Sequence, residues 1–175
     1  MKQLSIVLSL LFILNAGYVF GQKGNKDNKE NSNLEWYTDV LKANEKSQAT
    51  HKPIFAFFTG SDWCGWCRKL QADVFSKKEF IKWAKEKVIL VELDFPRMKK
   101  LPPELAQQNN ELQRIFQVQG YPTCWFFFLD KNDSTNQFQI TPLGSVGYPQ
   151  GAEQGKEQVQ FLNDANQVLA KIKAK

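Results

Sequence analysis

Three apolar runs of strand length stand out along the chain, at residues 54–58, 88–94 and 124–129, of which only the second contains charged residues, Glu92 and Asp94. Hydrophobicity sustained over so few residues predicts strands that are covered on both faces of a sheet. The third run is the most apolar and would aggregate if it were exposed, so we expect it to lie centrally in the sheet. A polar turn is expected at 131–136, and residues 138–140 then alternate in the way typical of an edge strand.

Apolar residues at helical spacing predict helices before, between and after these strands. We expect a first helix over 34–48, in which Leu34, Tyr37 and Leu41 share one side. A second helix follows the turn at 60–62 and continues to Val74, and the remaining helices lie near 80–84, over 104–116 and from about Lys156. The order strand, helix, strand predicts a βαβ unit with a parallel pair. Neither a repeat nor a second domain is indicated.

The first 21 residues resemble a secretory signal. Lys2 precedes an apolar run at 4–14, and the small residues Val19 and Gly21 predict cleavage before Gln22. The run is shorter than the roughly 20 residues that a membrane span needs, which argues against the alternative of an uncleaved anchor. Residues 22–33 lack apolar side chains and predict a disordered leader. We therefore expect a domain at 34–175, exported to the periplasm or secreted, without stable membrane insertion.

Composition narrows the classes of partner. The formal charge is +5, but the lysines are scattered and are not interleaved with aromatic side chains, so a solvated basic face is expected and no nucleic-acid partner. A small secreted domain stabilised by disulfides would carry more than the three cysteines present, Cys64, Cys67 and Cys124. The cysteines are therefore expected to take part in chemistry and not to form a structural framework. We also expect the protein to be a monomer.

The pair Cys64 and Cys67, with Gly65 and Trp66 between them, follows directly after a predicted buried strand. At the first turn of a helix, unpaired N–H groups would lower the pKa of the Cys64 thiol below its usual value of about 8.5. Cys67, one turn later, is close enough to form a disulfide ring with Cys64. We predict Cys64 as the nucleophile and Cys67 as the resolving thiol of a redox dithiol.

Two other classes of function stay open for this pair. Two thiolates can bind Cu(I) or contribute to a zinc site, but further ligands would have to come from Cys124 or His51. The pair could also be an inert structural disulfide in a binding module. For Cys124 itself a small core side chain is favoured over a third redox thiol, and for His51 a solvated loop position is favoured.

The arrangement resembles the thioredoxin superfamily, an α/β fold with a central mixed sheet flanked by helices, here with an extra N-terminal helix. The lead-in to Cys64 and the sequence Gly120-Tyr121-Pro122-Thr123 are similar to exported bacterial disulfide-reductase-like members. The resemblance implies a cis Tyr121–Pro122 bond facing the dithiol. It also implies a thiol–disulfide oxidoreductase without a cofactor, which acts on a protein disulfide and takes electrons from a thiol donor. The residues implied to contact that substrate are Trp63, Gly65, Trp66, Tyr121, Pro122 and Thr123.

Two positions depart from the pattern of this superfamily. Phe57 and Phe58 occupy the region where thioredoxins carry a buried aspartate, which leaves Glu92 on the neighbouring strand as the candidate proton acceptor. A strand-edge carboxylate that reaches solvent is the alternative for Glu92. Trp66 stands where thioredoxins have proline and oxidising isomerases have histidine. Because it supplies no cation to the Cys64 thiolate, we expect a more reducing couple than that of an isomerase.

Overall fold

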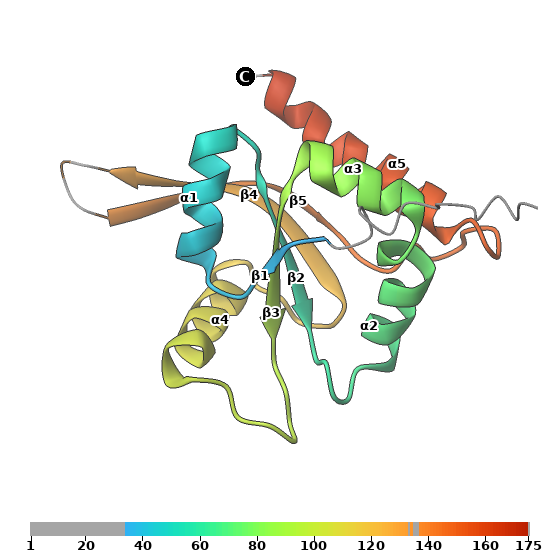
Figure 1. Cartoon of the computed structure of the whole chain (residues 1–175), viewed down its shortest axis with the longest axis horizontal. Coiled ribbons are helices and arrows are strands. Elements are labelled where there is room, and N and C mark those ends of the chain that lie inside the picture. Colours follow the sequence, from blue (N-terminus) through green and yellow to red (C-terminus); the bar gives the residue numbers. More distant parts are fainter. Residues whose placement is uncertain (1–33, 133, 135–136, 175) are drawn as a thin grey trace, which may run out of the picture.

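The computed structural model describes residues 34–132, 134 and 137–174. These residues form a mixed five-stranded sheet in the order β1-β3-β2-β4-β5, with helices on both faces (Figure 1). The expected signal at 1–21 and leader at 22–33 lie outside the described residues. No helix of the described part is both long enough and apolar enough to cross a membrane.

The sheet is built around its central strand, which corresponds to the first apolar run. Its strands are β1 (Trp36–Tyr37), β2 (Ile54–Thr59), β3 (Ile89–Asp94), β4 (Thr123–Asn132) and β5 (Gln137–Val146). Strand β2 pairs in parallel with β3 and antiparallel with β4, and all six of its residues are buried. The expected parallel pair and the internal position of the third apolar run, between β2 and β5, are both confirmed.

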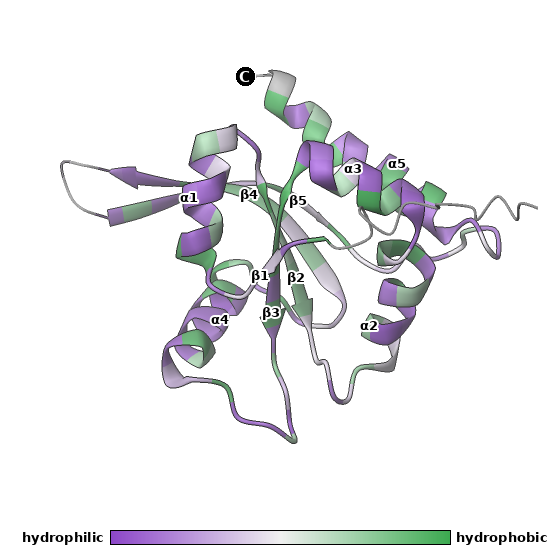
Figure 2. Ribbon diagram, viewed as in Figure 1, coloured by the Kyte–Doolittle hydropathy of each residue, from purple (hydrophilic) through white to green (hydrophobic). Residues whose placement is uncertain are grey.

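Helices cover the sheet on both sides. They are α1 (Val40–Thr50), α2 (Gly65–Leu70), α3 (Lys78–Lys87), α4 (Pro103–Ile115) and α5 (Glu157–Ala170), with a π-helical turn η1 (Gln71–Phe75) and a 3-10 turn η2 (Lys171–Ala174). Helices α1 and α4 lie on one face, and α2, α3 and α5 lie on the other (Figure 1). The inner strands of the sheet are mostly hydrophobic, whereas the projecting ends of β4 and β5 are hydrophilic and the helices carry both kinds of residue (Figure 2).

Alternation along β2 divides the core into two clusters of buried side chains. Phe55 and Phe57 point to the face of α2, α3 and α5, whereas Phe58 points to the face of α1 and α4. Phe55 contacts Phe126 of β4 edge to face, with ring centroids 5.0 Å apart. Each such ring contributes about 1.5–3 kcal/mol by its burial. The cluster that contains Phe55 and Phe57, the first cluster, also contains Cys64 and Cys67 and so holds the dithiol helix α2 against the sheet.

The prediction of a helix over 34–48 is wrong in its first residues. Trp36 and Tyr37 form β1, which pairs in parallel with β3. Helix α1 begins only at Val40, where the Asp39 carboxylate accepts the backbone N–H of Leu41 at 2.9 Å and caps the helix. Trp36 packs instead against aromatic rings of the first cluster, and this edge-strand pairing outweighs the helical spacing of the local sequence.

The predicted turn at 131–136 is also too long. Lys131 and Asn132 remain in β4, where they pair with Phe138 and Gln137 of β5. The polar side chains do not interrupt the ladder, because backbone hydrogen bonds hold this part of the hairpin where it projects beyond the helices (Figure 1).

Candidate active site

Cys64 and Cys67 are joined in a disulfide at the junction of β2 and α2, with their Sγ atoms 2.11 Å apart. Cys64 is the N-cap of α2, and its Sγ accepts the backbone N–H of Cys67 at 3.1 Å. A donor aimed at this sulfur would stabilise its thiolate after reduction. Cys64 is 5% exposed and Cys67 only 1%. This geometry suits the roles predicted for the two cysteines, with Cys64 as the sulfur nearer to solvent.

The loop before Cys64 is held by two carboxylates. The Asp94 carboxylate accepts the backbone N–H and the hydroxyl of Ser61, at 2.8 and 2.7 Å. The Asp62 carboxylate accepts the backbone N–H groups of Arg97 and Met98, at 3.0 and 2.8 Å. Desolvation works to raise the pKa of Asp62, but these backbone hydrogen bonds outweigh it and hold the pKa below its usual value. The loop that leads to the dithiol is therefore tied to the end of β3.

An aromatic cluster joins the dithiol loop to the Pro122 loop. The ring of Trp63 contacts that of Tyr121 edge to face, with centroids 5.7 Å apart, and Phe95 stacks on Tyr121 at 5.3 Å. Trp63 Nε1 also donates to the Phe95 carbonyl oxygen at 2.8 Å, and the Arg97 guanidinium lies 3.9 Å from the Trp63 ring centroid. The residue before Cys64 thus packs on the residue before Pro122.

The Pro122 loop has the backbone conformation that the resemblance implies, since the Tyr121–Pro122 peptide bond is cis. The hydroxyl of Thr123 donates to the Gly120 carbonyl oxygen at 2.7 Å and braces the loop from within. Burial raises the pKa of Tyr121 to about 12, so its hydroxyl stays neutral at physiological pH. Gln113 donates to that hydroxyl at 2.9 Å. Tyr121, Pro122 and Thr123 are each half-buried at the edge of the site.

Comparison with known proteins decides the family. A family model described as a thioredoxin-like domain matches residues 41–141, which is more than half of the chain. The chain belongs to the thioredoxin-like family. The fold expected from the sequence is confirmed by this match and by the mixed sheet with helices on both faces.

The relatives of this thioredoxin-like chain include two Chlamydia pneumoniae proteins. The chain is 42% identical over 97 residues to disulfide bond reductase DsbH, an alignment that covers 54% of this chain and 57% of the relative. It is 28% identical over 155 residues to thioredoxin-related protein DsbJ, covering 89% of this chain and 42% of the relative. The chain thus spans about half the length of these two proteins.

Solved structures point to the same group. A structure titled DsbH oxidoreductase superposes with a TM-score of 0.65 at 30% sequence identity, covering 86% of this chain and 94% of the other. A thioredoxin from Thermus thermophilus superposes with a TM-score of 0.53 at 19% identity, covering 79% and 88% of the two chains. The second match supports the fold alone, and the first extends the similarity to a disulfide-handling relative.

Glu92 lies on the dithiol face of this thioredoxin-like sheet. It pairs in register with Phe57, and Leu90, two residues before it, belongs to the same core cluster as Cys64 and Cys67. Glu92 is half-buried, and desolvation together with the nearby Asp94 carboxylate raises its pKa, an effect that Lys99 opposes. Phe57 and Phe58 are both fully buried, so neither of these two positions supplies a polar group next to the dithiol.

Cys124 and His51 take the positions that the sequence favours. Cys124 is fully buried in β4, and burial raises the pKa of its thiol well above the usual value. The reading of Cys124 as a core side chain is confirmed. His51 is exposed in the turn after α1. Within the described ranges, no group of three or more His, Cys, Asp or Glu side chains is arranged to hold a metal ion.

Several residues at this site carry no signal in the local sequence. Phe95 and Arg97 come from the loop after β3, and Tyr148 comes from the loop after β5, where its ring contacts Trp66. Each contacts a residue next to the dithiol or in the Pro122 loop only because of the fold, so sequence pattern alone misses them. Trp66 and Gly65 are exposed next to the disulfide-bonded cysteines.

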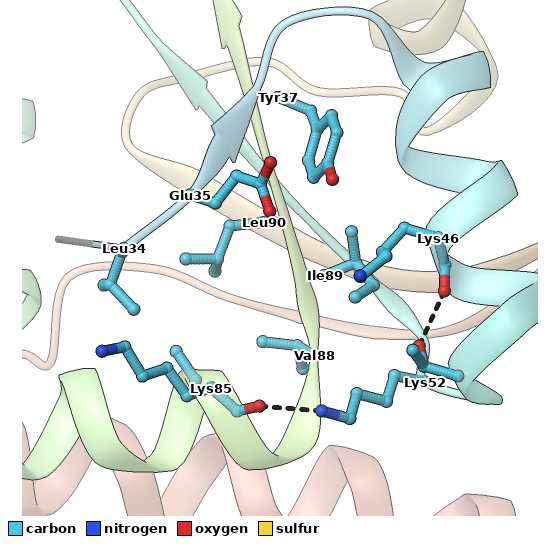
Figure 3. A pocket seen from close by; sticks show the side chains of 11 residues that line it. Leu34, Glu35, Tyr37, Lys46, Lys52, Lys85, Val88, Ile89 and Leu90 are labelled. Atoms are coloured by element: carbon cyan, nitrogen blue, oxygen red, sulfur yellow. Dashed lines mark hydrogen bonds between the residues drawn. The ribbon is translucent and has the colours of Figure 1, made fainter. Parts of the chain in front are cut away.

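A separate pocket of about 250 Å³ lies at the far end of the sheet (Figure 3). Its walls include Leu34, Lys46 and Val88, and Lys52 Nζ donates across it to the Lys85 carbonyl oxygen at 2.7 Å. This pocket adjoins the first residues of β3, whereas the dithiol loop is bonded to the last. The first and last residues of β3 lie roughly 17 Å apart along the strand. The pocket is therefore not part of the dithiol site.

Proposed function

We propose that this protein is a thiol–disulfide oxidoreductase that reduces or exchanges disulfides in exported proteins. The observation that carries the proposal is the Cys64–Cys67 disulfide at the start of α2, in a loop that packs on the Tyr121–Pro122 loop. The names of the relatives, a disulfide bond reductase and a DsbH oxidoreductase, support the same class of reaction.

The reaction begins from the reduced dithiol. The Cys64 thiolate attacks one sulfur of a substrate disulfide, forms a mixed disulfide and releases the other substrate sulfur as a thiolate. Cys67 then loses its proton and attacks Cys64 Sγ, which releases the second substrate thiol and leaves the Cys64–Cys67 disulfide. Two electrons pass to the substrate in each cycle. A thiol donor must return two electrons to the protein before the next one.

The substrate chain docks on the rim around the disulfide. Trp63, half-buried before Cys64, and the exposed Trp66 would present apolar surface to the substrate next to the sulfur pair, and the exposed Gly65 lies between Cys64 and Trp66 in the sequence. Pro122 has no N–H, and the backbone groups of Tyr121 and Thr123 can pair with an extended substrate segment as a short β-bridge. A protein or peptide disulfide is therefore the substrate class.

Glu92 is the proposed acceptor of the Cys67 proton. Support comes from its place on the dithiol face of β3 and from the raised pKa that burial and Asp94 give its carboxyl. A carboxylate with a raised pKa is a stronger base than an exposed one, as transfer from a thiol requires. No cofactor enters this scheme, because the electrons travel through sulfur alone.

The cellular setting belongs to the same proposal. The signal expected at 1–21 would direct the domain at 34–175 into the cell envelope, where disulfides form. The protein would act there as a monomer with a separate thiol protein as its electron donor, and without a nucleic-acid partner. An oxidising compartment makes that donor necessary, since the dithiol would otherwise stay oxidised.

Trapping of the mixed disulfide tests the proposal. Cys67→Ser leaves Cys64 without its resolving partner, so we expect covalent complexes with substrate proteins that disappear on reduction. Cys64→Ser is the matched control and should trap none. Reduction of insulin by the native protein with a thiol donor separates an enzyme from an inert binding module. If Cys67→Ser traps nothing while Cys64 still reacts with a thiol reagent, the proposal fails.

A further inference from the structure

Trp66, between the two cysteines, is 52% exposed but is not isolated. Its ring contacts that of Tyr148 edge to face, with centroids 5.1 Å apart and an interplanar angle of 61°. Tyr148 is half-buried in the loop between β5 and α5. The two rings come from distant parts of the sequence and together form a partly exposed aromatic surface beside the disulfide.

A polar cluster on the dithiol helix holds Tyr148 in place. The Tyr148 hydroxyl donates to Asp73 Oδ2 at 2.8 Å, and the same oxygen accepts a hydrogen bond from Lys69 Nζ at 2.5 Å. Lys69 Nζ also lies 5.1 Å from the centroid of the Tyr148 ring. The hydrogen bonds from Lys69 and Tyr148 lower the pKa of Asp73, so the carboxylate stays ionised at neutral pH. The orientation of Tyr148 is thereby fixed by residues that do not touch the sulfur atoms.

The segment that carries Tyr148 also adjoins the Pro122 loop. Gly147 lies beside that loop, and a Cβ built on it would be in ordinary van der Waals contact with the Pro122 carbonyl oxygen, at 3.7 Å. The surface formed by Trp66 and Tyr148 therefore extends from the dithiol helix toward the edge where a substrate segment would pair. A substrate cysteine bound at Cys64 would bring its neighbouring side chains over these two rings.

We propose that Trp66 and Tyr148 form a subsite for an aromatic or aliphatic side chain flanking the substrate cysteine, with Asp73 and Lys69 as positioning residues. The inference rests on the proposed oxidoreductase function and adds a substrate preference to it. An apolar side chain gains contact with both rings. A polar side chain at the same place would lose part of its hydration without finding a hydrogen-bond partner on the ring faces.

The test uses two disulfide-bonded peptides that differ only in carrying Phe or Ser next to one cysteine. We expect the native protein to reduce the Phe peptide with the higher kcat/KM. Tyr148→Ala should lower this preference about threefold to tenfold, mainly through KM. Tyr148→Phe keeps the ring but loses the hydrogen bond to Asp73, and should lower the preference about twofold. Phe138→Ala, which removes an exposed ring on the projecting hairpin, is the matched control and should keep it.

The outcomes separate this inference from the function on which it rests. A native protein that reduces neither peptide nor a small-molecule disulfide contradicts the proposed function itself. A native protein that reduces both peptides equally overturns only the subsite, as does a preference that survives Tyr148→Ala. If Tyr148→Ala does not fold, Trp66→Ala takes its place, because it removes an exposed side chain, and an unchanged preference in that variant overturns the subsite as well.

Discussion

The Asp94 carboxylate accepts two hydrogen bonds from Ser61, one from the backbone N–H at 2.8 Å and one from the hydroxyl at 2.7 Å. Asp94 ends β3, and Ser61 begins the turn that leads to Cys64. Lys99 Nζ lies 3.0 Å from the same carboxylate and balances its charge. Through this contact, the central sheet sets the place from which the dithiol helix starts.

Removing the Ser61 hydroxyl tests this link. Ser61→Ala should lower the free energy of unfolding by about 1–2 kcal/mol, because the hydroxyl donates to a charged and buried acceptor. Urea denaturation of the oxidised protein measures the change. Ser145→Ala, on the exposed side of β5, is the control and should stay within about 0.5 kcal/mol of the native protein. Equal effects of the two variants would show that the hydrogen bond from the Ser61 hydroxyl to Asp94 adds no stability.

The side chain between the cysteines should set the redox potential. Because Trp66 provides no cation for the Cys64 thiolate, we expect a potential below about −180 mV, the value of protein disulfide isomerase. Trp66→His should raise the potential by about 30 mV or more, which corresponds to 1.4 kcal/mol of added thiolate stabilisation. Equilibration with glutathione measures both values.

A control for this substitution lies on the opposite face of the sheet. Leu41→His introduces the same imidazole on the exposed side of α1 and should leave the potential unchanged. A native potential at or above the isomerase value would contradict the expected reducing character. A Trp66→His potential equal to that of Leu41→His would rule out this position as the one that sets it.

Glu92 should make stability fall as pH rises. Its carboxyl has a raised pKa in the folded protein, so above the usual value of 4.5 the folded state holds a proton that the unfolded state has lost. Stability then decreases with pH between 4.5 and the raised pKa. Glu92→Gln removes this titration. The free energy of unfolding of the variant relative to the native protein should therefore increase across that interval and level off above it.

The same variant tests the proposed proton transfer. If Glu92 accepts the Cys67 proton, Glu92→Gln should slow release of the substrate from the mixed disulfide by tenfold or more. The slowing should shrink at high pH, where the Cys67 thiol ionises unaided. Glu104→Gln, on the exposed first turn of α4, is the control. An unchanged rate of release in Glu92→Gln would remove Glu92 from the mechanism.

The sequence predicts the centre of this fold better than its edges. Strand β2 and the apolar part of β4 are continuous apolar runs, β3 is apolar except for Glu92 and Asp94, and burial on both faces leaves these strands no other stable arrangement. The spacing of Trp36 and Tyr37 fits a helix, and the helix predicted from it is wrong at these two residues. In the structure they pair with Leu90 and Val91 of β3 and form the edge of the sheet. A pairing partner so distant in the sequence cannot be inferred from the spacing of neighbouring residues.

The candidate site, too, is only partly predictable from the sequence. Cys64, Cys67 and Pro122 are found from motifs, since their chemistry depends on residue type and short spacing. Tyr148 and Arg97 join the site only through the fold, in which Tyr148 contacts Trp66 on the dithiol helix and Arg97 contacts Trp63 in the loop before that helix. Sequence reasoning therefore finds the cysteines that are proposed to react, whereas the surface proposed to select a substrate emerges from the tertiary structure.

The burial of Cys124 fixes the stoichiometry of the protein. Of its three cysteines, the one in β4 is buried in the core, so the Cys64–Cys67 couple should carry a single pair of electrons at a time in each molecule. Disulfide scrambling within the chain has no third partner in the native state. Titration with an oxidant should accordingly reach its end point at one equivalent per chain, and every covalent adduct should hold one substrate molecule.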